Sequence, residues 1–282
     1  MHQPQQHSPD MSETDFQVIA DIAHQEAGLV FTPEKASLVR SRINRRLRKL
    51  GIKRFSDYIA YITSPKGEGE QKSMIYSLTT NISSFFRESH HFDLFANKVF
   101  PQLLSNARNG GRVRIWSAGC SSGQEPYSIA MTMHSIAPDI SKLDVKVLAT
   151  DIDADVLEVA KTGFYHSSEI ENIIKNYRNE YFSPSTSDTQ NGYLIDNRIR
   201  SLITFRELNL LHDWPMNGLF DVIFCRNVVI YFDETTQLRL WPRFEKATAP
   251  KGWLFVGHSE RLSEKLDTCF QNVGPTTYRL PN

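Results

Sequence analysis

The hydrophobic pattern of this chain changes type near residue 110, and that change limits the folds open to it. Between about residues 12 and 78, apolar residues recur at helical spacing without the alternation typical of a strand. Beyond residue 110, short apolar runs of strand length alternate with helical segments. Such alternation predicts a mostly parallel sheet with crossover helices on its faces. We therefore expect an all-α region followed by an α/β domain.

Start and stop signals divide the first region into helices. Ser12 is a suitable cap for a first helix, and Pro33 opens a second one, because proline at the first helical position loses no hydrogen bond. The predicted helices cover residues 12–28, 33–50, 56–62 and 72–78. The predicted strands cover residues 113–116, 145–149, 202–205, 221–224 and 253–256, with helices at 125–136, 154–161 and 234–247.

The predicted domain boundaries follow from these patterns. The alternation of strands and helices is interrupted by a polar helix at 168–181, the loop SPSTSDTQNG and short strand-like pieces. This interruption indicates an inserted subdomain. The expected organisation is a disordered tail at 1–11, a helical domain at 12–80, a linker at 81–100, and an α/β domain at 101–282 with an insertion at about 164–206.

Composition excludes several classes of protein. The 282 residues include 32 basic and 32 acidic ones, which argues against a globally basic nucleic-acid-binding protein. The 40% of apolar residues are enough for a sizeable core, yet no apolar run approaches the ~18 residues of a membrane span. Because the N-terminus is polar and lacks an apolar core, we expect no signal peptide there. Because the cysteines are far apart, we expect no disulfide framework, no metal site and a cytoplasmic location; they are Cys120, Cys225 and Cys269.

The segment RVRIWSAGCSSGQEPYSIAMTMHS reads as strand, turn and helix. Gly119 and Gly123 allow a tight turn and close approach of a ligand. Their spacing is neither that of pyrophosphate-binding turns nor that of a Walker loop. A cofactor without a pyrophosphate, such as S-adenosylmethionine, suits this turn, although a purely structural turn remains the alternative. Glu125 would receive the cofactor's ammonium group or merely complement the helix dipole.

Polar residues also follow two other predicted strands. VLATDID places Asp151 where ribose hydroxyls would donate hydrogen bonds, while Asp153 can cap the next helix. Arg226, Asn227 and Tyr231 follow the predicted buried strand in the segment FDVIFCRNVVIYFDETT. Each residue alone is more simply explained as structural, but the carboxyl ends of parallel strands meet at one edge. Their convergence there favours a binding site.

The junction TTNISSFFRESHHF lies between the two regions. It forms either a linker helix that buries Phe85 and Phe86, or a lid that closes a cofactor pocket and presents Arg87 to a substrate anion. The residues themselves do not separate these readings.

These motifs together resemble the chemotaxis receptor glutamate O-methyltransferases, the CheR-type family. The matching segments occur in the family's order from about Glu13 to the end, and they are NISSFFRESHHF, WSAGCSSGQEPYSIA, ATDID, LNLL, FDVIFCRNVVIYFDETTQ and FVGHSE. The resemblance implies a four-helix domain, a linker and a Rossmann-like methyltransferase domain with a small inserted β-subdomain. It also implies methyl transfer from S-adenosylmethionine to glutamate side chains on chemoreceptors, leaving S-adenosylhomocysteine.

The resemblance carries over to individual residues. It implies that Arg87 and Tyr231 lie at the reacting centre, Arg87 orienting the acceptor carboxylate and Tyr231 lying near the methyl group. Ser83 departs from the family's usual threonine, and Gln124 stands where a second glutamate is frequent. The cofactor-binding residues implied are Asn81, Ser83, Arg87, Gly119, Glu125, Asp151, Asn209, Leu210, Arg226 and Asn227. A glutamate acceptor is already ionised at neutral pH, so this reaction needs no general base.

The helix predicted at 33–50 is strongly basic. Residues 29–54 contain nine basic residues and one acid, whereas residues 10–28 contain five acids and no base. The basic helix is either an ordinary solvated surface or a docking surface for an acidic partner, such as a receptor helix rich in glutamates. Its candidate receptor-binding residues are Arg40, Arg42, Arg45, Arg46, Arg48 and Lys49.

Two other classes of function stay open. A basic helix also binds phosphates, so one alternative is a nucleic-acid methyltransferase; no base-flipping motif and no cysteine placed as a pyrimidine nucleophile support it. The other is a non-catalytic adaptor that binds S-adenosylmethionine. We expect a monomeric enzyme without nucleic-acid partners that reaches the membrane only through receptors.

Overall fold

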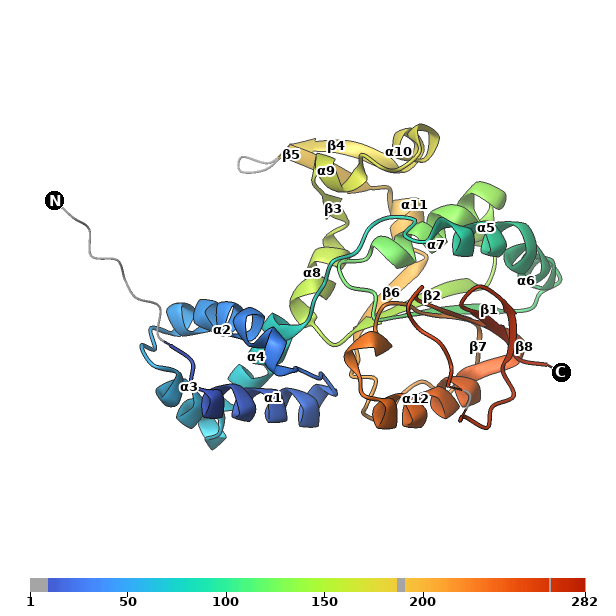
Figure 1. Ribbon diagram of the computed structural model, residues 1–282. Helices are drawn as coiled ribbons and strands as arrows, with labels where there is room; N and C mark the ends of the chain where they lie inside the picture. Colours follow the sequence, from blue (N-terminus) through green and yellow to red (C-terminus); the bar gives the residue numbers. More distant parts are fainter. Residues whose placement is uncertain (1–9, 187–190, 264, 282) are drawn as a thin grey trace. The chain divides into compact units, whose positions relative to one another are not determined.

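The computed structural model describes residues 10–186, 191–263 and 265–281, which form two compact units (Figure 1). One is the helical region up to Thr80 together with the short segment Tyr231–Asp233. The other contains Asn81–Ile230 and Glu234–Asn282. Residues 1–9 of the predicted tail and 187–190 of the predicted loop lie outside the described residues.

The helical unit contains the predicted helices. They are α1 (Glu13–Ala27), α2 (Ala36–Leu50), α3 (Phe55–Ile62) and α4 (Glu68–Leu78), with 3₁₀ turns at Pro33–Lys35 and Pro65–Gly67. Ser12 and Asp15 form a capping box that starts α1, and Gly28 ends it with a φ of 68°. Helix α4 begins four residues before the predicted start, because Glu68 and Glu70 stabilise its first turn.

The second unit is built on a seven-stranded sheet with the order β6-β2-β1-β7-β8-β10-β9. The strands are β1 (Val113–Ala118), β2 (Val145–Asp151), β6 (Ile203–Glu207), β7 (Phe220–Cys225), β8 (Thr248–Val256), β9 (Gln271–Gly274) and β10 (Thr277–Arg279). The first five strands in this order are parallel, and β10 and β9 add an antiparallel edge. The predicted Rossmann-like α/β architecture is confirmed, whereas the antiparallel edge was not predicted.

Helices cover both faces of this sheet. Figure 1 shows α5, α6 and α7 on one face and α12 on the other. The helices of this unit outside the insertion are α5 (Ser89–Leu94), α6 (Phe100–Arg108), α7 (Gln124–Ile136), α8 (Ala154–Thr162) and α12 (Glu234–Ala247), with a π-helical turn at Phe95–Val99 between α5 and α6. Residues 89–108 are therefore mostly helical, although the sequence predicted only a linker up to residue 100.

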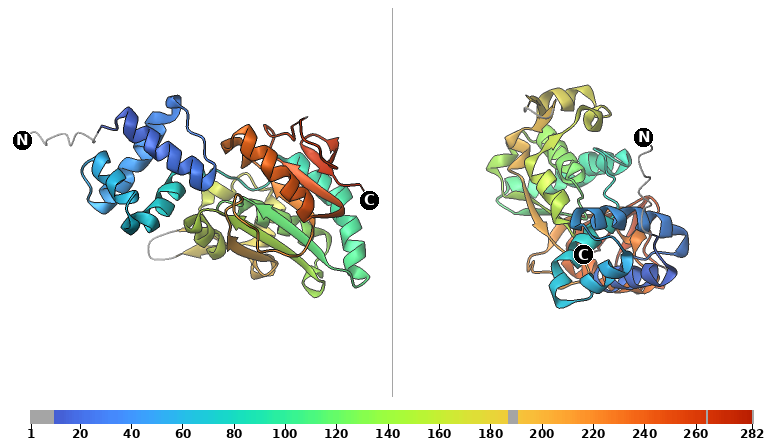
Figure 2. Two further views of the ribbon diagram at one scale, coloured as in Figure 1. Left: turned by 90° about the horizontal axis from the view of Figure 1, so that it is seen from below. Right: turned by 90° about the vertical axis from the view of Figure 1, so that its left-hand side faces the viewer.

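The insertion forms a small antiparallel sheet with the order β3-β5-β4. Its elements are β3 (Phe164–Tyr165), α9 (Ser167–Ile170), α10 (Lys175–Tyr181), β4 (Phe182–Thr186), β5 (Asn191–Ile195) and α11 (Asn197–Arg200). Figure 2 shows that this sheet stands away from the main one. The single polar helix predicted at 168–181 is divided into α9 and α10, since the chain turns between them to bury Ile170 and Ile173.

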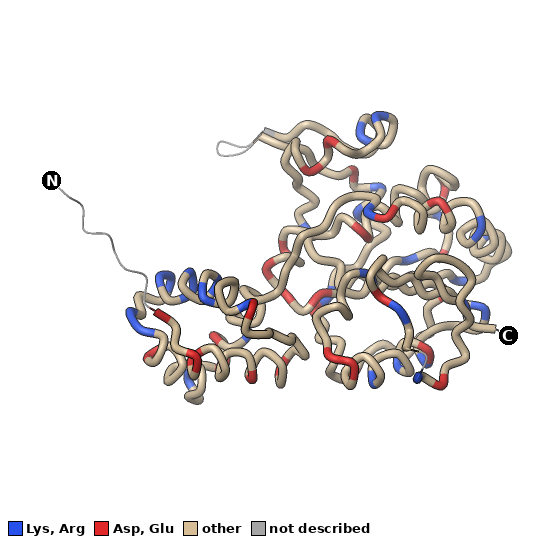
Figure 3. Tube along the Cα trace, viewed as in Figure 1, with Lys and Arg blue, Asp and Glu red and all other residues tan. Residues whose placement is uncertain are grey.

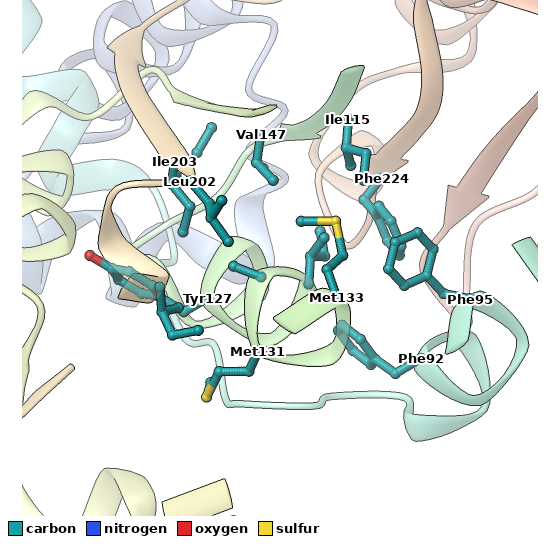
Figure 4. Close-up of a cluster of buried hydrophobic side chains, with 14 of the residues drawn as sticks. Phe92, Phe95, Ile115, Tyr127, Met131, Met133, Val147, Leu202, Ile203 and Phe224 are labelled. Atoms are coloured by element: carbon teal, nitrogen blue, oxygen red, sulfur yellow. The ribbon is translucent and has the colours of Figure 1, made fainter. Parts of the chain in front are cut away.

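The core lies between the sheet and the helices of the α7 face. Figure 4 shows Met133 of α7 beside Phe92, Phe95 and Phe224. Because parallel strands are covered on both faces, β1 and β7 are almost wholly buried. Among the described helices, none is both long and apolar enough to cross a membrane.

Candidate functional site

The carboxyl ends of β2, β1 and β7 lie side by side, because these strands are neighbours in the parallel sheet. The chain runs outward from β1 to β2 and later returns to the other side of β1 with β7. This reversal of strand order is the place where open α/β sheets bind ligands. The predicted glycine turn, acidic loop and Arg226–Asn227 loop therefore meet at one edge.

The glycine turn after β1 is held closely against its neighbours. Gly119 has a φ of 81°, and a Cβ built on it would lie 2.3 Å from Cγ2 of Val228 in the loop after β7. The backbone N–H groups of Gly119 and Cys120 both donate to the Thr150 carbonyl, at 2.7 and 2.9 Å. The Ser121 N–H donates to the Asp151 carboxylate at 2.7 Å. Three successive N–H groups are thus engaged within the protein, which leaves them unable to hold a pyrophosphate and fits a cofactor that has none.

Asp151 links the turn to the loop after β2. Its second carboxylate oxygen accepts the Asp153 N–H at 3.0 Å. Burial raises the pKa of Asp151 to about 6, against the effect of these N–H donors. Asp153 caps α8, and its other oxygen accepts the Asn81 side-chain amide at 2.7 Å. Asn81 also accepts the Ser121 hydroxyl through its carbonyl at 3.0 Å, so this linker residue lies against the turn.

The close contact at Gly119 leads to a testable expectation. Gly119→Ala should raise the dissociation constant for S-adenosylmethionine at least about tenfold, corresponding to roughly 1.4 kcal/mol, because the new methyl group displaces Val228 and its loop. Isothermal titration calorimetry measures this change. Gly110→Ala is the matched control, since Gly110 has a φ of 84° but, apart from its chain neighbours, no heavy atom of the described residues lies within 4 Å of an added Cβ. Equal losses of affinity in both variants would contradict the steric explanation.

A buried charge cluster lies beside the turn. The guanidinium of Arg226, which is 5% exposed, contacts Glu125 at 2.9 Å and Glu88 at 3.2 Å. It also donates to the backbone carbonyl of Arg87. Glu125 accepts the Ser117 hydroxyl at 2.7 Å through its other oxygen. The predicted cofactor residues Glu125 and Arg226 are therefore joined directly, and the linker is joined to Arg226.

The protonation states of this cluster follow from burial and neighbouring charges. Burial opposes ionisation of Glu88, but Arg226 and the N–H donors of His258 outweigh it and lower the pKa of Glu88 to about 2. Burial, aided by Arg226, lowers the pKa of His91 to about 3, so this imidazole is neutral at pH 7. Burial raises the pKa of Glu125, while Arg226 opposes that rise.

The linker at 81–88 is not helical, so of the two alternatives for this junction the linker helix does not hold for this segment. Phe85 is buried edge-on against Tyr165 and Phe182, with ring centroids 4.9 and 5.4 Å apart. Phe86 donates its N–H to the Ser128 hydroxyl at 3.0 Å. The side chain of Arg87 donates to the Ile82 carbonyl at 3.1 Å, and Ser83 is half-buried.

The predicted adenine-side pair follows β6. The Leu208 N–H donates to the Asp151 carbonyl at 2.9 Å, which brings Asn209 and Leu210 to the same edge. The Asn209 side chain accepts the Leu211 N–H at 2.9 Å. The Leu210 carbonyl accepts the indole N–H of Trp214 at 3.1 Å. This loop is therefore held in a fixed conformation by its own hydrogen bonds.

Tyr231 is placed differently from the other candidates. It groups with the helical unit, where its carbonyl accepts the Val30 N–H at 2.9 Å and its hydroxyl donates to the Thr80 carbonyl at 3.4 Å. Its predicted place near the transferred methyl group stays a prediction.

Two carboxylates of this site had no predicted role. Glu88 lies inside the quoted segment NISSFFRESHHF and Glu260 inside FVGHSE, so their positions beside motif residues were the available signal. The buried carboxylate of Glu260 accepts the N–H groups of Gly257, Asn227 and Ile230 at 2.6, 2.8 and 3.2 Å. It thereby joins the loop after β8 to the loop after β7. In the described part of the chain, no group of three His, Cys, Asp or Glu side chains is placed to hold a metal ion.

Known proteins resemble this chain along most of its length. A family model described as "CheR methyltransferase, all-alpha domain" matches residues 14–79, and one described as "CheR methyltransferase, SAM binding domain" matches residues 81–279. The "Probable chemotaxis protein methyltransferase" of Rhizobium etli is 47% identical, over 91% of this chain and 96% of its own length. The "Chemotaxis protein methyltransferase" of Escherichia coli is 40% identical, over 96% and 92%. The "Chemotaxis protein methyltransferase 2" of Pseudomonas aeruginosa is 38% identical, over 94% and 92%.

Proposed function

Because this chain belongs to the CheR methyltransferase family, we propose that it transfers the methyl group of S-adenosylmethionine to glutamate side chains of chemoreceptors, forming glutamyl methyl esters. The names of its relatives support a role in chemotaxis. The glycine turn, whose N–H groups are engaged by the protein itself, supports a cofactor without a pyrophosphate. S-adenosylhomocysteine would be the second product.

The state of the carboxylates at this edge is the observation that carries the choice of acceptor. Glu88 and Glu125 are paired with Arg226, and both oxygens of Asp151 accept backbone N–H groups. None of the three is left available to remove a proton. A glutamate acceptor, with an unperturbed pKa of about 4.3, is ionised at neutral pH and needs no base. The site therefore suits a carboxylate better than an amine or hydroxyl acceptor.

The protein's contribution to this reaction is binding, orientation and exclusion of water. When bound, S-adenosylmethionine supplies an electrophilic methyl group on a sulfonium. The backbone at Gly119, the Glu125–Arg226 pair and the loops after β2 and β6 would hold it. Arg87 would then orient the acceptor carboxylate in line with the sulfur–methyl bond, about 3 Å from the methyl carbon. Anion and cation neutralise each other as the bond forms, so a dry site favours the reaction.

One assay separates this function from its rivals. The protein is incubated with S-adenosylmethionine labelled in the methyl group and with receptor-containing membranes, and the product is then treated with alkali. We expect label on the receptors that is released as volatile methanol, because carboxyl methyl esters hydrolyse in base. Receptors with alanine in place of the methylatable glutamates are the control.

Other outcomes have definite meanings. Alkali-stable label on nucleic acid would overturn the proposal in favour of a nucleic-acid methyltransferase. S-adenosylmethionine binding without any transfer would favour the non-catalytic adaptor.

We further propose that the helical unit docks the receptor through α2. Figure 3 shows basic residues along this helix. Two of them are half-buried and have partners inside the unit: Arg42 donates to the carbonyls of Leu78 and Thr79, both at 2.6 Å, and Arg46 pairs with the buried Glu70. Two exposed ones also have contacts there, since Arg40 pairs with Asp10 at 3.2 Å and Arg48 donates to the Asn44 carbonyl at 3.2 Å. The docking surface of α2 is accordingly limited to its exposed basic residues, which are Arg40, Arg45, Arg48 and Lys49.

Charge reversal on α2 should weaken receptor binding. The double substitution Arg45→Glu with Arg48→Glu is expected to raise KM for receptor membranes about tenfold or more, while the affinity for S-adenosylmethionine stays unchanged. The defect should shrink as salt is added, because added ions screen the new repulsion. Initial rates against receptor concentration measure KM. Lys142→Glu with Lys146→Glu carries the same charge change on exposed residues of the other unit, and an equal effect there would contradict docking through α2.

A further inference from the structure

We propose that Glu88 is a positioning residue that holds Arg87 in the orientation needed for the acceptor carboxylate. This inference rests on the proposed methyl transfer to glutamate. It concerns a carboxylate that would touch neither cofactor nor acceptor and would act through the residue before it.

The linker bends sharply around Arg87. The residues on either side, Phe86 and Glu88, have positive φ angles of 53° and 57°. Non-glycine residues avoid this conformation, because Cβ comes too close to the following carbonyl oxygen. It persists only where the surroundings over-determine it, and such strain is concentrated at functional sites. Arg87 is thus the tip of a strained turn that something must hold in place.

The carboxylate of Glu88 makes several of the contacts that stabilise this turn. One of its carboxylate oxygens accepts the backbone N–H of His258 at 3.1 Å and the Asn227 amide at 3.4 Å, and lies 3.0 Å from Nδ1 of His258. The other oxygen lies 3.2 Å from the guanidinium of Arg226. The side chain therefore connects the linker to the loop after β7 and to the loop after β8.

Pairing with Arg226 alone does not account for Glu88. Arg226 already has a closer carboxylate partner, because Glu125 lies at 2.9 Å and Glu88 at 3.2 Å. Burying a second carboxylate beside one guanidinium carries a desolvation penalty. The contacts of Glu88 with His258 and Asn227 give that buried charge a role in joining three segments of backbone.

Arg87 is held through its backbone, and its guanidinium has no ion-pair partner among the residues that the structure describes. Its carbonyl accepts Arg226, and its guanidinium donates to the Ile82 carbonyl at 3.1 Å. Within the described residues, no carboxylate lies within ion-pair distance of this guanidinium. Its backbone is fixed on both sides while its charge stays available to an external carboxylate.

The test is a double-mutant cycle. Glu88→Gln should lower kcat for receptor methylation about 100-fold, the loss that a misplacement of about 1 Å produces, with the dissociation constant of S-adenosylmethionine changed less than threefold. In an Arg87→Ala background, Glu88→Gln should cause no further loss, because a residue that acts through Arg87 has nothing left to position. Multiplicative losses in the double variant would overturn the inference.

Two further measurements keep the inference independent of folding and of the proposed function. His258→Ala removes one contact of Glu88 at a side chain that is 64% exposed, so it carries little folding risk, and its smaller loss of kcat should vanish in the Glu88→Gln background. Hydrogen–deuterium exchange of Glu88→Gln should show lost protection confined to the linker and to the loops at 226–230 and 256–260. Unchanged protection of the linker would refute the positioning role. Wild-type protein that yields no alkali-labile label would refute the proposed function, while the exchange result would still decide whether Glu88 holds the linker.

Discussion

Arg226→Met should destabilise the α/β unit by about 3–5 kcal/mol, because it leaves Glu125 and Glu88 buried without their shared cation. The loss should also abolish measurable binding of S-adenosylmethionine, since α7 and the linker lose the guanidinium that joins them to the loop after β7. Urea unfolding followed by tryptophan fluorescence measures the change. All four tryptophans belong to the α/β unit, so this signal reports on that unit alone; they are Trp116, Trp214, Trp241 and Trp253.

Replacing the two carboxylates that lose their partner, Glu88 and Glu125, is the control for this prediction. Adding Glu88→Gln and Glu125→Gln to Arg226→Met should restore part of the lost stability, because uncharged amides replace unpaired carboxylates. It should not restore cofactor binding. An Arg226→Met protein that unfolds within 1 kcal/mol of the wild type, on the order of the contribution of an exposed pair, would show that the cluster is weakly coupled to folding.

Arg87→Ala should lower kcat about 100-fold while leaving the affinity for S-adenosylmethionine within about threefold. The reason is that the planar guanidinium orients the acceptor carboxylate. That contact forms only when the receptor is bound, so the affinity for S-adenosylmethionine does not depend on it. Arg87→Lys should recover little activity, because an ammonium cannot hold a carboxylate through two parallel hydrogen bonds. Tyr231→Phe should likewise reduce turnover more than cofactor affinity. Initial rates with labelled cofactor, combined with calorimetric titration, separate the two quantities.

Wild-type turnover in Arg87→Ala or in Tyr231→Phe would remove that residue from the reacting centre. A loss of cofactor affinity as large as the loss of turnover would instead assign it to cofactor binding. For Arg87, the intact Arg226 contact to its backbone carbonyl makes the side-chain substitution a local change.

Much of the site was predictable because parallel strands bring their carboxyl ends together. Gly119, Asp151 and Arg226 each follow a short apolar run, so their meeting at one edge followed from the strand assignments. Their partners did not follow. That Asp151 binds ribose stays a prediction, and the structure adds that its carboxylate holds the N–H groups of Ser121 and Asp153. Both uses involve a carboxylate at a strand end, and a sequence pattern does not distinguish them.

The conformation of the linker could not be predicted from the residues around it in the sequence. Its two phenylalanines fit an amphipathic helix, yet the chain there is bent at positive φ. The bend is stable because Phe85 packs on the insertion and Glu88 reaches the loops after β7 and β8. Those partners lie between about 80 and 170 residues away along the chain, so no window around the linker contains them.

The sequence alone determined the helical region, the alternation of strands and helices that predicts a parallel sheet, and the glycine turn. It could do so because periodicity, capping residues and glycine act within a few neighbouring residues. It also carried the family resemblance. Only the tertiary structure decided that Arg226 is shared between Glu125 and Glu88, that Arg42 and Arg46 serve the helical unit itself, and that Arg87 sits at the tip of a strained turn. These pairings depend on burial, because a charged group removed from water requires a partner, and the fold supplies that partner from a distant part of the sequence.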